Sequence, residues 1–351
     1  MMGKLKKLTG YRLFLPLSCL IIVLLINLIT TPTFFRITIN NGVLYGYIID
    51  VINRASELVV LAVGMTLVVS ASAGTDISVG AVMAVAAAVC TRVLAGGEVS
   101  VNEYANPYVL AVLAALAAAV VCGGFNGFLV AKLKIQPMVA TLILFTAGRG
   151  ISQLVTNGQI TYIRVDGYKL LGNNIPGIPI PTPIFVAVIV VALTYILLKK
   201  TAMGMYIQSV GINERASRLV GLKSVKIIWM AYAFCGLCAG IAGLVASSRI
   251  YSADANNIGL NMELDAIAAG ALGGNSLGGG RFSLLGSVIG AYTIQALTTT
   301  LYAMSVPADQ IPVYKAIVVI LIVAVQSEEL KKFRKRLASR HSSKNVEGGV
   351  A

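Results

Sequence analysis

Two apolar runs flank a short polar break in the stretch ASELVVLAVGMTLVVSASAGTDISVGAVMAVAAAVCTRVL, residues 55–94. The first run covers about 55–73, and the second follows Asp76 and ends near Leu94. Each run approaches the roughly 18–20 apolar residues that a helix needs to cross the hydrocarbon core of a bilayer. In the break, Gly74 can end the first helix and Asp76 can cap the second. The stretch predicts two membrane-spanning helices joined by a polar interruption.

The rest of the 351-residue chain has the same apolar character. It is 57% hydrophobic and 12% charged, whereas soluble domains average roughly 45–50% apolar and 25% charged residues. Further apolar runs occur at residues 13–30, 108–131, 138–155, 184–198, 227–248, 264–274, 283–302 and 312–326. With the first two runs they make about ten crossings, of which 264–274 is short and broken. We therefore expect an all-α fold, a polytopic membrane helix bundle with broken or re-entrant segments.

Pairs of glycines recur inside the apolar runs at a spacing of one helical turn. The pairs are Gly123/Gly127, Gly236/Gly240 and Gly286/Gly290. Small residues at this spacing let two membrane helices approach closely. The pairs predict helix–helix contacts within the bundle.

The net charge of +14 is concentrated at the two ends of the chain and in a few loops. The positive-inside rule therefore places both termini in the cytoplasm, which an even number of crossings permits. The loop 96–107 has two Glu and no Lys or Arg, which indicates an external loop. The expected organisation is a cytoplasmic segment 1–12, a transmembrane permease domain 13–326 and a basic cytoplasmic tail 327–351. Membrane topology explains this distribution of charge, so no nucleic-acid partner is needed to account for it.

The residues that enzymes need are scarce. His341 is the only histidine, which excludes a Ser-His-Asp triad and a His-rich metal site. The stretch GGNSLGGG, residues 273–280, lacks the Gly-Lys-Ser/Thr ending of a phosphate-binding loop and follows no strand. It is typical of a helix break or a tight turn. We expect a chain without catalysis, metal or bound cofactor of its own.

Charged residues inside the apolar runs are few. Arg54 and Glu57 are three residues apart on one helix face and could form an ion pair. Asp76 can serve either as a cap or as a contact for a permeating solute. No series of carboxylates runs through the spans, which weakens a proton-coupled mechanism.

The stretch SVGINERASRLVGLKSVKIIW, residues 209–229, gathers charged residues in an otherwise apolar chain. One interpretation is a solvated cytoplasmic loop. The other is a short helix, closed by Gly221, that lies across the cytoplasmic face and docks a partner.

Within this stretch, VGINERASRLVGL resembles the coupling loop of permease subunits from bacterial ATP-binding-cassette sugar importers, the ribose, xylose, arabinose and galactose group. The family form is G-x-N-E-x-A-A-R-L-x-G-I, inside a loop that corresponds to 200–226 here. The matching positions are Asn213, Glu214, Ala216, Arg218, Leu219 and Gly221. Arg215 and Ser217 depart from the usual Glu and Ala. The resemblance implies that Arg215 and the matching positions couple the chain to an ATPase.

The resemblance extends over nearly the whole chain. It includes the segments at 64–84, 125–142, 148–151 and 264–291, and segment 40–68 is most similar to the galactofuranose-type permeases. Polar or small residues in these segments are the candidates for the translocation pathway: Asp76, Ser78, Gly80, Asn126, Thr141 and Asn275.

The resemblance implies a multi-pass subunit of a bacterial inner membrane that translocates a pentose or hexose, with galactofuranose among the candidates. Its implied partners are cytoplasmic ATPase subunits that bind the ATP, a periplasmic or lipid-anchored sugar-binding protein, a second permease copy or paralogue, and membrane lipid. The alternative is an ion-coupled secondary carrier of a small polar solute, which would need coordinating groups at mid-membrane and no docking loop.

Overall fold

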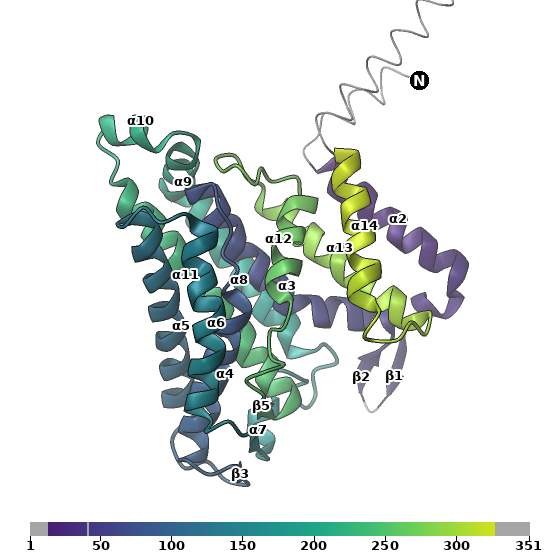
Figure 1. Ribbon diagram of the computed structural model, residues 1–351. Helices are drawn as coiled ribbons and strands as arrows, with labels where there is room; N and C mark the ends of the chain where they lie inside the picture. Colours follow the sequence, from purple (N-terminus) through teal and green to yellow (C-terminus); the bar gives the residue numbers. More distant parts are fainter. Residues whose placement is uncertain (1–12, 41, 327–351) are drawn as a thin grey trace, which may run out of the picture.

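The computed structural model describes residues 13–40 and 42–326, and it is a bundle of helices that run between two ends (Figure 1). The short helices α9 (Met203–Ile212) and α10 (Glu214–Leu219) lie at one end, here named the α10 end. A small sheet lies at the other, the sheet end. The predicted terminal segments 1–12 and 327–351 lie outside the described residues.

Every apolar run of the sequence contains a helix. Six helices are long and apolar enough to cross a membrane: α3 (Tyr47–Ser72), α5 (Tyr108–Ala131), α6 (Pro137–Val155), α8 (Thr182–Lys200), α11 (Ser224–Ile250) and α13 (Leu284–Ala303). Four are shorter: α2 (Phe14–Thr30), α4 (Val79–Ala95), α12 (Met262–Leu272) and α14 (Ile311–Gln326). The predicted all-α membrane bundle, with a short, broken α12, is confirmed.

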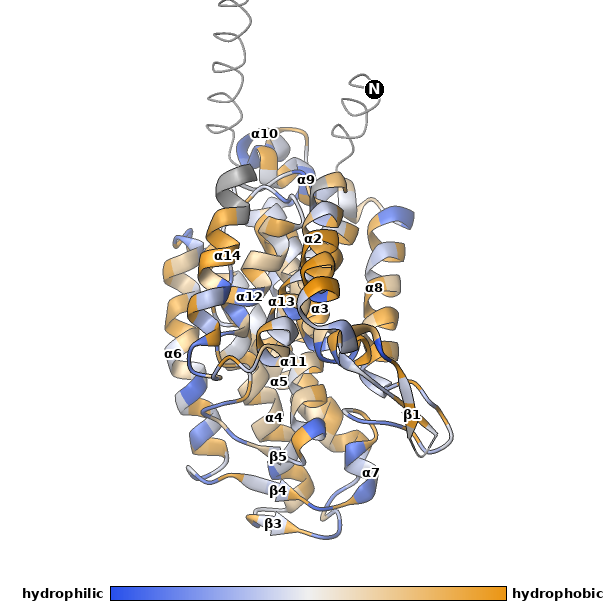
Figure 2. Ribbon diagram, turned by 90° about the vertical axis from the view of Figure 1, so that its right-hand side faces the viewer, coloured by the Kyte–Doolittle hydropathy of each residue, from blue (hydrophilic) through white to orange (hydrophobic). Residues whose placement is uncertain are grey.

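The helix α3 lies at the centre of the bundle. In its most apolar stretch 89% of the residues are buried, against 17% in α8. Side chains such as Leu193 and Ile196 on α8 are exposed, and α2 and α14 are hydrophobic along most of their length (Figure 2). An apolar exterior around a packed centre fits a protein solvated by lipid.

The glycine pairs make the close helix contacts that their spacing predicts. A Cβ atom added at Gly123 of α5 would lie 2.4 Å from the carbonyl oxygen of Tyr232 in α11. On the facing helix, one added at Gly236 would lie 2.4 Å from the carbonyl oxygen of Ala119. Between α12 and α13, a Cβ at Gly290 would lie 2.0 Å from the carbonyl oxygen of Ala269. Only glycine fits these crossings.

The sheet end joins three connecting segments that are far apart in sequence. Its strand order is β3 (Ser100–Val101), β4 (Thr161–Ile163), β5 (Ser252–Ala253). The first pair is parallel and the second antiparallel. Beside it lies the short helix α7 (Asp166–Lys169), where the Tyr168 hydroxyl and Ser247 Oγ are 2.7 Å apart. The sheet thus holds the loops of this end as one unit.

A hairpin projects sideways from the bundle (Figure 2). It follows the 3₁₀ turn η1 (Pro32–Phe35) and pairs β1 (Thr38–Asn40) with β2 (Val43–Tyr45) in antiparallel register. Phe34 is buried at its base and stacks on Tyr47, with ring centroids 5.6 Å apart.

The expected ion pair between Arg54 and Glu57 is wrong. Glu57 of α3 instead pairs with Arg249 of α11, with a 3.0 Å separation between Nη2 and Oε1. Arg249 also donates to the carbonyl oxygen of Asn53. The inter-helix pair forms because Arg249 is held in the bundle at the end of α11, whereas Arg54 is on the exposed side of α3. The helix α3 begins at Tyr47, before the predicted start of its apolar run near residue 55.

Candidate translocation and coupling site

The break between α3 and α4 is a buried polar junction. The helix α3 ends at Ser72, and the residue after it, Ala73, adopts a left-handed conformation with φ 52°. Asp76 follows and is only 2% exposed. Its Oδ1 accepts from the backbone N–H of Ser78 at 2.9 Å and from the Ser78 hydroxyl at 2.6 Å. The expected capping role of Asp76 is therefore wrong. Ser78 is the residue that directly precedes α4, and Asp76 accepts hydrogen bonds from Ser78 rather than from the N–H groups of the helix.

Two neighbouring helices bring further predicted residues to this junction. Asn126 of α5 donates to Ser78 Oγ at 2.8 Å and to Asp76 Oδ1 at 3.4 Å. Thr141 of α6 accepts from the backbone N–H of Ile77 at 3.2 Å. We name Asp76, Ser78, Asn126 and Thr141 the break cluster. It joins α3, α4, α5 and α6 through polar contacts.

The break cluster and the adjacent Thr75 have unused hydrogen-bonding capacity. Among the described residues, no group donates to Asn126 Oδ1 or partners Thr75 Oγ1, although both atoms are buried. Buried polar atoms in proteins are nearly always satisfied, by protein or by water. The junction is thus equipped to bind water or the hydroxyl groups of a solute.

Gly80, in the first turn of α4, serves close packing. A Cβ atom there would lie 2.2 Å from the carbonyl oxygen of Gly259 and 2.3 Å from Glu263 Oε2. The segment before α12 therefore presses directly onto α4. Gly259 itself has φ +70°, a conformation that glycine adopts without strain.

Arg149 and Glu263 bring opposite charges to the same region. Arg149 of α6 donates through Nη1 to the carbonyl oxygens of Ala255 and Ile258, at 2.9 and 2.5 Å. Glu263 is 4% exposed, and in the described part of the chain its Oε2 and the Nη2 of Arg149 have no partner. In the sequence, Arg149 is only a charged residue near the end of the apolar run 138–155. No local pattern links it to the carbonyl oxygens of Ala255 and Ile258.

Asn275 lies apart from the break cluster. Its Nδ2 donates to Ser287 Oγ at 2.6 Å, and its Oδ1 accepts from the backbone N–H of Ser283 at 2.7 Å. These bonds close the glycine-rich segment 273–280, which forms a turn as its composition predicts. The turn lies on the end of α3, where the Gly280 N–H donates to the carbonyl oxygen of Ser70.

Within the stretch 209–229, here named the coupling stretch, residues 214–219 form the short exposed helix α10, as one of the two interpretations predicts. Asn213 caps α10, because its Oδ1 accepts from the backbone N–H of Ala216 at 3.0 Å. Gly221 follows the helix with φ +87°. Leu219 and Val220 are 89% and 78% exposed at this end of the molecule. Arg215 and Ala216 are exposed as well.

Glu214 anchors α10 to the bundle. Its Oε1 accepts from Lys134 Nζ and from Arg218 Nη2, each at 2.5 Å, and from Ser224 Oγ at 3.1 Å. Burial raises the pKa of Glu214, but the hydrogen bonds from Lys134 and Arg218 outweigh it and hold the pKa below its ordinary range. Lys134 was not among the predicted site residues, and no local pattern links it to Glu214.

The helix α9 connects α10 to the end of α3 by backbone contact. A Cβ atom at Gly211 would lie 1.7 Å from the carbonyl oxygen of Ser70 and 2.7 Å from the N–H of Gly280. Beside this contact, a cavity of about 260 Å³ is lined by residues that include Ala73, Lys134 and Glu214. The coupling stretch thus lies next to the end of α3, where the break between α3 and α4 begins.

Known proteins with similar sequences are membrane permeases. The galactofuranose transporter permease protein YtfT of Escherichia coli is 44% identical over 92% of this chain and 92% of its own length. The fructose import permease protein FruF of Bifidobacterium longum is 37% identical over 99% and 96%. The ribose import permease protein RbsC of Escherichia coli is 35% identical over 89% and 93%. No solved structure matches the chain.

A family model described as the branched-chain amino acid transport system / permease component matches residues 47–326. The match covers the break cluster, α9 and α10, and nearly all of the described helices. Together with the apolar helices, it identifies a multi-pass membrane protein. The chain belongs to this family of transport-system permease components.

Proposed function

We propose that the chain is the non-catalytic membrane subunit of an ATP-binding-cassette importer that moves a monosaccharide into the cytoplasm of a bacterium. The observation that carries the proposal is the similarity to galactofuranose, fructose and ribose permeases over most of each chain. A pentose or hexose passes the break cluster, whose polar groups match its hydroxyls. ATP binds to a separate ATPase subunit.

The exposed helix α10 supports docking of that ATPase. Its apolar end, Leu219 and Val220, projects away from the bundle, and exposed apolar side chains beside charged ones are typical of protein interfaces. The other side of α10 is tied to the bundle through Glu214 and Lys134. Movement of the ATPase would therefore pass through α9 to the end of α3.

The distribution of charge supports a cytoplasmic α10 end and an external sheet end. Basic residues gather at the α10 end: Lys132, Lys134, Lys199, Lys200, Arg215, Arg218, Lys223, Lys226 and Arg281. Fewer basic residues lie toward the sheet end, namely Arg92, Arg164 and Lys169, and they stand beside Glu98, Glu103, Asp166 and Asp254. The positive-inside rule gives the orientation. A periplasmic or lipid-anchored binding protein then delivers the sugar at the sheet end.

The surface of α6 supports a second permease copy or a paralogue beside this one. Thr146, Gly150 and Gln153 lie one and two turns apart on one exposed face of α6. Polar groups on a membrane helix are costly against lipid and favourable against protein or water. We assign this face to the contact with a second permease.

The test compares two matched glycine substitutions in the full transporter. Gly221 follows α10 and Gly177 lies in the loop between α7 and α8. Both have φ +87°, and no atom lies within 4 Å of a Cβ added at either position. Gly221→Asp and Gly177→Asp therefore impose the same backbone strain at opposite ends of the molecule. Each variant is purified with its ATPase and assayed for ATP-dependent sugar uptake in vesicles.

The proposal expects Gly221→Asp to lose both ATPase binding and uptake, and Gly177→Asp to keep ATPase binding. Equal ATPase binding by both variants would contradict docking at α10. Uptake by the wild-type chain in vesicles that contain an ion gradient and no ATP would overturn the importer in favour of a secondary carrier.

A further inference from the structure

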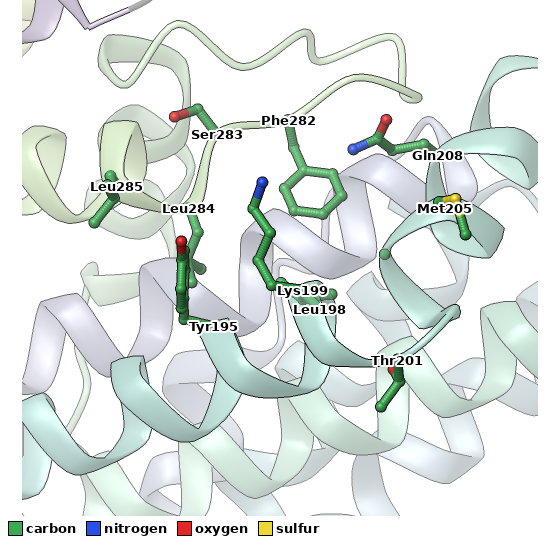
Figure 3. Close-up of a pocket in the computed structure, with 11 residues that line it drawn as sticks. Tyr195, Leu198, Lys199, Thr201, Met205, Gln208, Phe282, Ser283, Leu284 and Leu285 are labelled. Atoms are coloured by element: carbon green, nitrogen blue, oxygen red, sulfur yellow. The ribbon is translucent and has the colours of Figure 1, made fainter.

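A cavity of about 510 Å³ opens at the α10 end between α8, α9 and the segment that leads into α13. Figure 3 shows Tyr195 and Lys199 rising from α8 toward Phe282 and Ser283, with Gln208 of α9 on the opposite side. The cavity is separate from the break cluster and from the exposed face of α10. Nothing in the proposed transport cycle requires it.

The polar part of the cavity is suited to an anion. Lys199 has no ion pair or hydrogen bond among the described residues, and no Asp or Glu lines the cavity. The side chains of Gln208 and Tyr195 likewise have no hydrogen-bond partner in the described part of the chain. A lysine, an amide and a phenol therefore bring free hydrogen-bond donors to the lining of the cavity.

The start of α13 adds to this preference. Ser283 Oγ accepts from the Gly286 N–H at 3.1 Å, and its carbonyl oxygen accepts from the N–H of Ser287. This leaves the N–H groups of Leu284 and Leu285 without an acceptor in the described structure. Both residues line the cavity. The N-terminal end of a 20-residue helix carries a partial positive charge.

The remaining lining is apolar and faces outward. Met205 is 66% exposed and Leu285 is 48% exposed, and Leu198 and Phe282 also contribute. The cavity lies at the end of α8, whose exposed surface is apolar. A ligand with an anionic head and an apolar tail satisfies both parts of the lining, whereas a free anion satisfies only one.

We propose that this cavity binds one anionic phospholipid, with its phosphate at Lys199 and the start of α13, and its acyl chains against Leu285 and Met205. Basic pockets between membrane helices near the membrane surface bind such headgroups. The lipid joins α8 and α9 to the segment that follows the glycine-rich turn. It therefore braces the base of the coupling stretch. The proposal does not depend on the transported solute.

The test measures lipid binding to the purified full chain by native mass spectrometry. Phosphatidylglycerol and phosphatidylcholine with identical acyl chains are titrated against wild type, Lys199→Gln and Lys200→Gln. Lys200 is the matched control, because it is the next residue of α8 and does not line the cavity. A fourth variant, Leu285→Trp, fills the apolar part and keeps the charge.

The expected result is one phosphatidylglycerol that binds wild type and Lys200→Gln more tightly than phosphatidylcholine. Lys199→Gln should weaken that lipid about fivefold, the contribution of one lysine at an anionic surface. Leu285→Trp should weaken both lipids at this site.

Three outcomes would overturn the proposal. Equal losses in Lys199→Gln and Lys200→Gln would mean general attraction to the basic end. Equal affinity of wild type for the two lipids would mean no headgroup site. Displacement of the lipid by inorganic phosphate, with no effect of Leu285→Trp, would mean a site for free anions.

Discussion

Lys134 and Glu214 lie 80 residues apart in the sequence, and their side chains meet at 2.5 Å. The contact ties the turn between α5 and α6 to the first residue of α10. An exposed ion pair of this kind contributes about 0.2–1 kcal/mol to stability. The ion pair matters mainly because it positions α10, since Glu214 accepts at the same time from Arg218 and Ser224. The orientation of α10 on the bundle depends on this one carboxylate.

Reversing the charge at Glu214 should uncouple transport without unfolding the protein. In Glu214→Lys, three cations face one another at the base of α10, and the helix loses its anchor. We expect coupled uptake to fall by at least about tenfold, while thermal stability changes by no more than about 1 kcal/mol. Arg215→Gln is the control, since Arg215 is exposed and is not an anchor. Normal uptake by Glu214→Lys would refute the anchoring role.

The anchoring of α10 should weaken in acid. The pKa of Glu214 is lower in the folded protein than its ordinary value of 4.5. A lowered carboxyl pKa stabilises the folded arrangement above the ordinary pKa, and that contribution is lost as the pH falls through the lowered value. Hydrogen exchange of residues 214–219, corrected for its intrinsic pH dependence, should accelerate on the acid side of 4.5. Lys134→Met should shrink this change, and an identical pH profile in that variant would argue against the ion pair.

Substitutions at Asp76 should separate transport from folding. Asp76→Asn keeps an acceptor for Ser78, so assembly and thermal stability should change little while uptake is impaired by the loss of charge. Asp76→Ala leaves the backbone N–H and the hydroxyl of Ser78 buried without their acceptor, which should cost about 1–3 kcal/mol. Thermal unfolding of both variants, beside sugar uptake, tests this. Wild-type uptake in Asp76→Asn would exclude a role for the charge.

Gly211 should tolerate no side chain, whereas Gly150 should tolerate one. A Cβ at Gly211 would overlap the carbonyl oxygen of Ser70, and one at Gly150 would have no atom within 4 Å. Overpacking of this kind typically costs about 1–3 kcal/mol. We expect Gly211→Ala to lower the unfolding temperature and to separate α9 from α3, which a cysteine pair across the contact can report. Equal stability of Gly211→Ala and Gly150→Ala would show that α9 is free to shift.

Breaking the buried pair between Glu57 and Arg249 should destabilise the protein more than breaking an exposed pair. The two side chains are 13% and 17% exposed. Removing one partner of such a pair leaves an uncompensated charge and costs about 3–5 kcal/mol. Arg249→Met should therefore destabilise the protein strongly, and Arg54→Met should be nearly neutral. Replacing both partners, in Glu57→Leu with Arg249→Met, should restore most of the stability, and failure to do so would mean that Arg249 acts mainly through the carbonyl of Asn53.

The helices could be predicted from the sequence because membrane insertion depends on local composition. Most of the apolar runs are long enough to predict a helix without knowledge of their neighbours. The helix α10 could be predicted because Gly221 is a local signal for the end of a helix. Asp76 and Ser78 meet because they are two residues apart in one break.

The partners of these groups depend on packing that no local pattern records. Arg54 has the right spacing to meet Glu57, yet Arg249 takes that place because α11 crosses α3 there. The same holds for Lys134 and Glu214, and for Arg149 with the carbonyl oxygens before α12. The helix α9 was missed because it is short, follows two lysines and lies inside what reads as a polar loop.

The contact of Gly211 with the carbonyl oxygen of Ser70 is made by backbone atoms. A contact between backbone atoms does not depend on the identity of the side chains around it. Residues that select the solute can therefore change in the course of evolution without any change in the contact between α9 and α3. One backbone contact of this kind can serve permeases for many solutes.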